Sequence, residues 1–292
     1  MRIAEALGLA IEALTAGGIP AGARFEAENL LADLLRVDRL RLRSHSEIEL
    51  TPDQAQAFDE RIRRRAGREP AAHILGFREF HRYRFSVSPE VLIPRPETEQ
   101  IIDLATGEFH SARPARILDL CTGSGCIGIT LLQEFNQAGL DCDVVLTDLS
   151  SGAIAMARKN LVQVAPDFAR RCRLYQGDLD EALPEAERVL GFHIIVSNPP
   201  YIGTDEAEEL APEVRDFEPA MALFHADPLA LYRRIFVAAR ELLTDDGVLL
   251  LELGPRFAKD LRTIAGEFFA RSQLRKDYAG LDRVLVATEP RR

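Results

Sequence analysis

The sequence lacks tryptophan and contains only four cysteines among its 292 residues. These cysteines are Cys121, Cys126, Cys142 and Cys172. They form neither a C-x-x-C pair nor a Cys/His spacing typical of zinc sites, so we expect no metal centre and no disulfide framework. Long uncharged apolar runs are also missing, and acidic Glu5 and Glu12 lie in the first residues. We therefore expect no signal peptide and no membrane-spanning helix, with the cytosol as the default location.

Negative charge outnumbers positive charge. The chain has 36 Lys and Arg against 46 Asp and Glu, for a net charge of −10 and a pI near 5.2. This balance argues against a sequence-independent grip on nucleic acid, which needs clustered cations. One short run of arginines exists, at Arg61, Arg63, Arg64 and Arg65, and we interpret it as a solvated helix face.

The first 72 residues show helical periodicity only. Leu7, Ile11 and Leu14 recur at helical spacing, residues 25–37 carry a second apolar stripe, and Thr51-Pro52 is typical of the start of a third helix. This region is too small to hold a cofactor by itself. We interpret residues 1–72 as a helical substrate-recognition domain.

Residues 73–96 differ from what precedes them. Short aromatic-rich runs around Phe80 and Phe85 predict a β-hairpin, and Pro94 and Pro96 make a stiff linker. For Phe80 two readings stay open: a wall of the active site, or packing at a domain junction.

Residues 97–292 alternate between strand and helix patterns. The predicted strands are residues 116–120, 144–147, 173–176, 193–197, 248–253, 274–278 and 283–288. Such alternation predicts a doubly wound α/β domain, in which helices cover both faces of a seven-stranded, mostly parallel, Rossmann-like sheet.

A glycine-rich loop follows the first of these strands, as Cys121-Thr122-Gly123-Ser124-Gly125. Glycines let the backbone turn tightly beside a ligand, and the helix that follows offers free N–H groups. Asp148 ends the next strand, 23 residues beyond Gly125, where a carboxylate can bind both hydroxyls of a ribose. An adenosine-bearing cofactor is indicated. Because Gly123, Gly125 and Gly128 satisfy G-x-G-x-x-G, a nicotinamide dinucleotide remains a rival here.

The motif Asn198-Pro199-Pro200-Tyr201 directly follows another apolar strand. The prolines have no N–H, so the Pro199 carbonyl and the Asn198 side-chain carbonyl are both free to accept hydrogens from a planar –NH2 group. The Tyr201 ring can pack on the conjugated face of that group. We expect these residues to position the nitrogen beside a methyl donor, which favours S-adenosylmethionine over a nicotinamide cofactor.

With these motifs, the chain resembles the protein-glutamine N5-methyltransferases that modify peptide chain release factors. The resemblance spans nearly the whole chain and is carried by the helical N-terminus, the glycine loop, and residues 92–99, 198–201 and 213–219. It implies methylation of the glutamine in a Gly-Gly-Gln loop, with the N-terminal helices helping to hold the factor. The acidic balance of the chain adds the expectation of no direct nucleic-acid substrate.

The resemblance also implies roles for single residues. Cys121, Thr122, Gly123, Ser124 and Gly125 would cradle the methionine end of the cofactor, and Asp148 its ribose. Asp178 would accept a hydrogen bond from the adenine amino group while Leu179 packs on the ring. Asn198, Pro199, Pro200 and Tyr201 would bind the target amide, with Asn198 also bordering the cofactor.

Two residues depart from the family pattern and keep alternatives open. Cys121 stands where many members have glycine, and Leu179 where some have a larger aromatic residue. Cys121 also resembles related enzymes that methylate a large-subunit ribosomal protein, which is the second candidate substrate. Adenine aminomethylation in nucleic acid, a nicotinamide-dependent oxidoreductase and a silent binding module are further alternatives.

Overall fold

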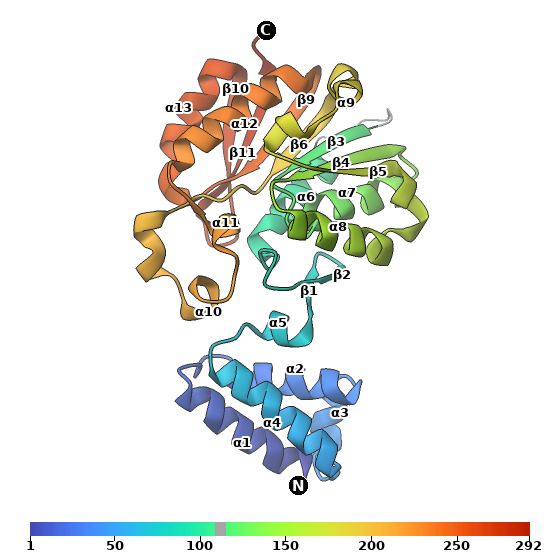
Figure 1. The fold of residues 1–292 in the computed structure, drawn as a ribbon, viewed down its shortest axis with the longest axis vertical. Coiled ribbons are helices and arrows are strands. Elements are labelled where there is room, and N and C mark those ends of the chain that lie inside the picture. The colour runs from blue at the N-terminus through green and yellow to red at the C-terminus, as the bar shows by residue number, and fades with distance from the viewer. Residues whose placement is uncertain (109–114) are drawn as a thin grey trace. The chain divides into compact units, whose positions relative to one another are not determined.

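The computed structural model describes residues 1–108 and 115–292 (Figure 1). The chain forms two compact units. One contains residues 1–77 and 210–217, and the other contains residues 78–209 and 218–292. Domain limits at residues 72 and 96 remain a prediction.

The first unit is helical. Its elements are α1 (Ile3–Ala16), α2 (Ala23–Leu35), α3 (Arg39–Ser44), α4 (Pro52–Ala66), α5 (Ala71–Leu75) and α10 (Pro212–Arg215). The three predicted helices correspond to α1, α2 and α4, while the shorter α3 and α5 were not anticipated. At the start of α4, Thr51 and Gln54 form a reciprocal capping box, in which each side chain accepts from the backbone N–H of the other residue.

The prediction that the arginine run is a solvated helix face holds for Arg63 and Arg64, whose side chains are exposed, and was wrong for Arg65. Arg65 is only 4% exposed, and its guanidinium binds Glu26 at 2.5 Å and Glu213 at 3.4 Å. Arg61 binds Asp33 at 2.8 Å. The acidic partners lie far away in sequence, so the run alone gave no sign that these cations are paired within the fold.

The second unit is built on a seven-stranded sheet, as predicted. Its strands are β3 (Ala115–Leu120), β4 (Cys142–Asp148), β5 (Cys172–Gln176), β6 (Phe192–Ser197), β9 (Leu243–Glu252), β10 (Phe269–Lys276) and β11 (Asp282–Pro290). Their order is β10-β11-β9-β6-β3-β4-β5. The strands from β9 to β5 run parallel, while β11 pairs antiparallel with both β9 and β10.

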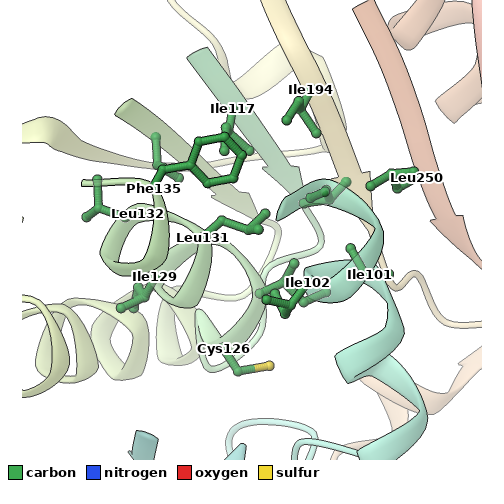
Figure 2. Packing of buried hydrophobic residues seen from close by; sticks show 14 of the residues in the cluster. Ile101, Ile102, Ile117, Cys126, Ile129, Leu131, Leu132, Phe135, Ile194 and Leu250 are labelled. Carbon is green, nitrogen blue, oxygen red and sulfur yellow. The ribbon is translucent and has the colours of Figure 1, made fainter. Parts of the chain in front are cut away.

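Helices cover both faces of the sheet. On one face lie α6 (Glu99–Gly107), α7 (Cys126–Gln137) and α8 (Ser151–Val164), and on the other α12 (Pro228–Leu242) and α13 (Ala258–Phe268) (Figure 1). Successive strand residues alternate between two fully buried clusters, as expected for a sheet covered on both sides. Figure 2 shows Ile117, Ile194 and Leu250 from three strands packing with Leu131 and Phe135 of α7.

The predicted hairpin consists of β1 (Phe77–Phe80) and β2 (Tyr83–Ser86), joined by two residues. Phe80 is buried and packs edge-on against Phe85, with ring centroids 6.1 Å apart. Of the two readings, packing is therefore the one that the structure supports. Four further short elements are α9 (Glu185–Leu190), α11 (Ala220–Leu223), β7 (Ile202–Gly203) and β8 (Phe224–His225). The described residues also contain short 3-10 helices at Pro96–Thr98, Pro166–Arg171, Leu179–Ala182, Thr204–Glu209 and Pro255–Phe257.

The strand order reverses between β3 and β6. From β3 the chain continues outward to β4 and β5, whereas β6 lies on the other side of β3 and leads to β9. In open α/β sheets ligands bind beyond the carboxyl ends of strands at such a switch point. The glycine loop, Asp148 and the Asn198 motif follow the carboxyl ends of β3, β4 and β6, so the fold gathers them at one edge of the sheet.

Candidate active site

The loop between β3 and α7 is tightly wound. Cys121, Gly123 and Gly125 all have left-handed backbone, with φ of 58°, 55° and 81°. A Cβ on Gly125 would lie 2.6 Å from Ile129 Cδ1, so packing as well as conformation requires glycine there. A Cβ on Gly123 would meet nothing within 4 Å. Gly123 thus borders open space, while Gly125 packs the loop onto α7.

Asp119 supports this loop from beneath. Its Oδ2 accepts from the Thr122 hydroxyl at 2.6 Å and from the Gly128 backbone N–H at 3.0 Å. Burial raises the pKa of this carboxyl to about 7. Gly128, the third glycine of the sequence pattern, thus serves helix packing and holds Asp119. Asp119 was not among the predicted site residues.

Asp148 lies at the carboxyl end of β4, as the sequence indicated. Its Oδ2 accepts from the Gly123 N–H at 2.8 Å, and its Oδ1 accepts from the Ser150 N–H at 2.9 Å. Burial raises the pKa of Asp148. Each carboxylate oxygen keeps further lone-pair capacity, and this is what two neighbouring ribose hydroxyls require.

Asp178 and Leu179 follow β5. Leu179 is buried with a left-handed φ of 48°, and Asp178 Oδ2 accepts from Arg234 of α12 at 2.9 Å. The Arg234 partner was not foreseen from the sequence. It holds the carboxylate that the resemblance assigns to the adenine amino group.

These elements enclose a cavity of about 530 Å³ within the second unit. This volume is within the range of small-molecule sites. The predicted residues that line it are Cys121, Thr122, Gly123, Ser124, Asp148, Asp178, Leu179, Asn198 and Pro200. Gly125, Pro199 and Tyr201 are not part of the lining, so their predicted contacts with cofactor or substrate remain predictions.

The proline turn after β6 is held by a network of side chains. Asn198 Nδ2 donates to Thr98 Oγ1 at 3.3 Å, and that hydroxyl donates to Glu252 Oε2 at 2.6 Å. The Tyr201 hydroxyl donates to Glu252 Oε1 at 3.4 Å. Burial raises the pKa of Glu252 to about 7. Neither Thr98 nor Glu252 was predicted as a site residue. The one sequence feature that could have indicated Glu252 is its position directly after the apolar residues 248–251.

The linker before α6 is tied down by Glu218. The carboxylate accepts from the Ile93 N–H at 2.9 Å and from the Arg95 guanidinium at 2.5 Å. Both Arg95 and Pro94 line the cavity. Glu99, at the start of α6, accepts from the His81 N–H at 2.9 Å. The segment that the resemblance singled out is therefore a fixed wall of the cavity.

His193 and Cys121 lie near the site but are not set up as a base and a nucleophile. His193 Nδ1 accepts from the Arg116 backbone N–H at 3.1 Å, as a satisfied histidine beside the sheet would. Burial raises the pKa of the Cys121 thiol well above its usual range, which disfavours the thiolate needed for nucleophilic attack. Among residues 1–108 and 115–292, no group of His, Cys, Asp and Glu is arranged to hold a metal.

Two family models match the chain. Residues 5–76 match the PrmC N-terminal domain, and residues 98–214 match the methyltransferase small domain. In the part of the chain that the structure describes, we find no helix with the length and apolar character to cross a membrane.

Curated relatives match over most of their length. A release factor glutamine methyltransferase of Cereibacter sphaeroides is 41% identical over 99% of each chain. One from Geobacter sulfurreducens is 40% identical over 90% of this chain and 88% of its own, and one from Leptospira interrogans is 34% identical over 91% of each. These relatives set aside the oxidoreductase and the silent binding module. The chain belongs to the release factor glutamine methyltransferase family and is a methyltransferase.

Proposed function

We propose that this protein transfers the methyl group of S-adenosylmethionine to the side-chain amide nitrogen of the glutamine in the Gly-Gly-Gln loop of a peptide chain release factor, in the cytoplasm. Family membership supports the reaction and the substrate class. The structural observation that carries the proposal is the orientation of Asn198. Its amide nitrogen is committed to Thr98, so its oxygen remains available to accept from an –NH2 group at the cavity.

S-adenosylmethionine is the cofactor of this methyltransferase, and the cavity fits it. The open space beside Gly123 leaves room for the methionine end, and the two Asp148 oxygens would accept from the ribose hydroxyls. Leu179 offers an apolar surface for the adenine ring. When bound, the cofactor supplies an electrophilic methyl group on a sulfonium.

The proline turn is proposed to hold the glutamine amide. Asn198 Oδ1 and the Pro199 carbonyl would accept the two amide hydrogens, and Pro199 and Pro200 bring no N–H that could compete. Two fixed acceptors place the nitrogen and disperse the charge that develops on it as the N–C bond forms, until one N–H proton is lost to solvent water, so no strong base is needed. Tyr201 is held through its hydroxyl by Glu252, and its proposed contact with the amide face rests on the family resemblance.

We further propose that residues 1–72 form the substrate-recognition domain, residues 73–96 a hairpin and linker, and residues 97–292 the methyltransferase domain. The two family matches, ending at residue 76 and beginning at residue 98, support these limits. The helical first unit has its own buried core, including Leu14, Leu30 and Phe58, which suits a separate binding role.

The proposal is tested by incubating the protein with purified release factor and methyl-labelled cofactor. We expect label in a single peptide that contains Gly-Gly-Gln, and none when that glutamine is replaced by alanine. The Asn198→Ala variant should bind S-adenosylhomocysteine normally but lose about 100-fold in rate, because it removes an acceptor that acts on the reacting nitrogen. Label on a ribosomal protein or on bare nucleic acid, with none on release factor, would contradict the proposal.

A further inference from the structure

Thr98 links two side chains that face different surroundings. Its hydroxyl is buried at the start of α6 and has one hydrogen to donate. That hydrogen goes to Glu252 Oε2 at 2.6 Å, so the Thr98 oxygen is left as an acceptor. Asn198 Nδ2 fills this role at 3.3 Å. Hydrogen-bond donation runs from Asn198 through Thr98 to Glu252, and no hydrogen bond to the Asn198 oxygen is found within residues 1–108 and 115–292.

We propose that Thr98 and Glu252 are positioning residues for methyl transfer, because the Glu252 carboxylate, acting through Thr98, keeps the oxygen of the Asn198 amide directed at the substrate. This inference rests on the function proposed above and deepens it. If the Asn198 amide were flipped, its –NH2 group would face the substrate in place of its oxygen. Two –NH2 groups are both donors, so a flipped Asn198 could not bind the –NH2 of the glutamine. Whether Asn198 can accept from the substrate therefore depends on Glu252, which accepts the hydrogen of the Thr98 hydroxyl.

The ionised form of Glu252 is essential to this arrangement. As a carboxylate it only accepts, which obliges Thr98 to donate toward it. Once protonated, it can donate to Thr98, whose hydrogen is then free to bond the Asn198 oxygen and reverse the amide. The direction in which hydrogen bonds are donated between Asn198, Thr98 and Glu252 thus depends on whether Glu252 is ionised.

Glu252 is surrounded by groups that act on its charge. It is 1% exposed at the end of β9, and the Tyr232 hydroxyl binds its backbone oxygen at 3.1 Å. The titratable and charged groups that act on it are Arg283 of β11, Glu97 before α6, Tyr201 after β6, Tyr232 of α12 and Cys126 of α7. Burial outweighs the Arg283 cation and raises the Glu252 pKa to about 7, so the switch falls in an accessible range.

The first experiment changes Thr98 and measures steady-state methylation of release factor together with S-adenosylhomocysteine binding. Thr98→Val keeps the shape and removes the hydroxyl, and we expect kcat to fall about tenfold with KM and cofactor affinity nearly unchanged. Thr98→Ser should restore most of that rate. Thr106→Val is the matched control in α6, since the Thr106 hydroxyl donates to the Ile102 carbonyl one turn earlier, and it should behave like the native protein.

The second experiment records kcat against pH. The native protein should lose rate as the pH falls through about 7, because Glu252 becomes protonated. Glu252→Gln should abolish this acid limb, whereas Asp119→Asn should leave it in place. Asp119 is the necessary comparison because burial also raises its pKa to about 7.

Three results would overturn the inference while leaving the proposed function intact. Thr98→Val could match Thr106→Val in kcat, it could lose cofactor affinity in proportion to rate, or Asp119→Asn could remove the acid limb instead of Glu252→Gln. If the native protein labels no release factor, the proposed function itself fails, and that result is recognised before any variant is compared.

Discussion

The glycine loop after β3 and the proline turn after β6, which we propose hold the cofactor and the target amide, are shaped by opposite means. The glycine loop owes its shape to its backbone, which contains several left-handed residues. Backbone N–H groups also donate to the carboxylates of Asp119 and Asp148. The proline turn has no N–H on two successive residues and is held by side chains. The glycine loop is thus shaped mainly by its own backbone, with Asp119 and Asp148 as anchors, whereas the proline turn depends on side chains from distant segments.

This contrast predicts that the glycine loop is sensitive to backbone changes at specific positions. Gly125→Ala combines a left-handed φ with a clash against Ile129 and should lower the free energy of unfolding by about 3 kcal/mol. Gly123→Ala meets open space and should cost only about 1 kcal/mol. Urea unfolding of the two variants provides the measurement. Equal losses would show that packing against α7 does not set the loop.

Both regions also rest on a buried carboxyl, Asp119 under the loop and Glu252 under the turn, with pKa raised to about 7. A raised folded-state pKa favours the neutral form, so the stability it contributes is present at low pH and is lost as the pH rises through about 7. Between about pH 5.5 and about pH 8, each group should lower the free energy of unfolding by about 2 kcal/mol.

Urea unfolding at several pH values tests this second prediction. Asp119→Asn and Glu252→Gln should each remove part of the decline, and the double variant should remove most of it. Carboxyls whose pKa is lowered by ion pairs, such as Glu69 and Glu187, are already ionised throughout this window and contribute little to the slope. An unfolding free energy that does not fall with pH would contradict the raised pKa values.

The smallest effect concerns the ribose site. Asp148→Ala should weaken S-adenosylhomocysteine binding about tenfold, because it removes charged acceptors for the ribose and the anchor of the Gly123 N–H. Asp143→Ala, on the same strand but outside the cavity lining, is the control and should bind normally. Calorimetry measures both. If the affinity of Asp148→Ala is unchanged, the backbone of the glycine loop, without the Asp148 carboxylate, accounts for cofactor binding.

Much of the fold was predictable because its signals are local. Alternating apolar strands and helices gave all seven strands of the sheet, and the glycine loop and Asp148 could be assigned because each lies at the end of a recognisable strand. Strand limits were less accurate, since β9 begins at Leu243 and the apolar run begins at Val248. The polar residues that start this strand carry no apolar signal.

The support of the amide site could not be predicted in the same way. Thr98 and Glu252 are 154 positions apart, and only the folded sheet brings them within hydrogen-bonding distance. The Arg234 partner of Asp178 and the Glu218 clamp on Ile93 are likewise distant in sequence. Sequence motifs identify atoms that contact ligands, while the residues that orient those atoms depend on tertiary pairing.

Cys121 adds a chemical constraint to a cavity that receives an alkylating agent. Cys121 is part of the cavity lining, and a thiolate there would compete with the proposed acceptor for the methyl group. Burial, reinforced by the Asp148 charge, keeps the group as a protonated thiol. The protein can therefore carry a sulfur atom in this position without inactivating itself by self-methylation during repeated turnover.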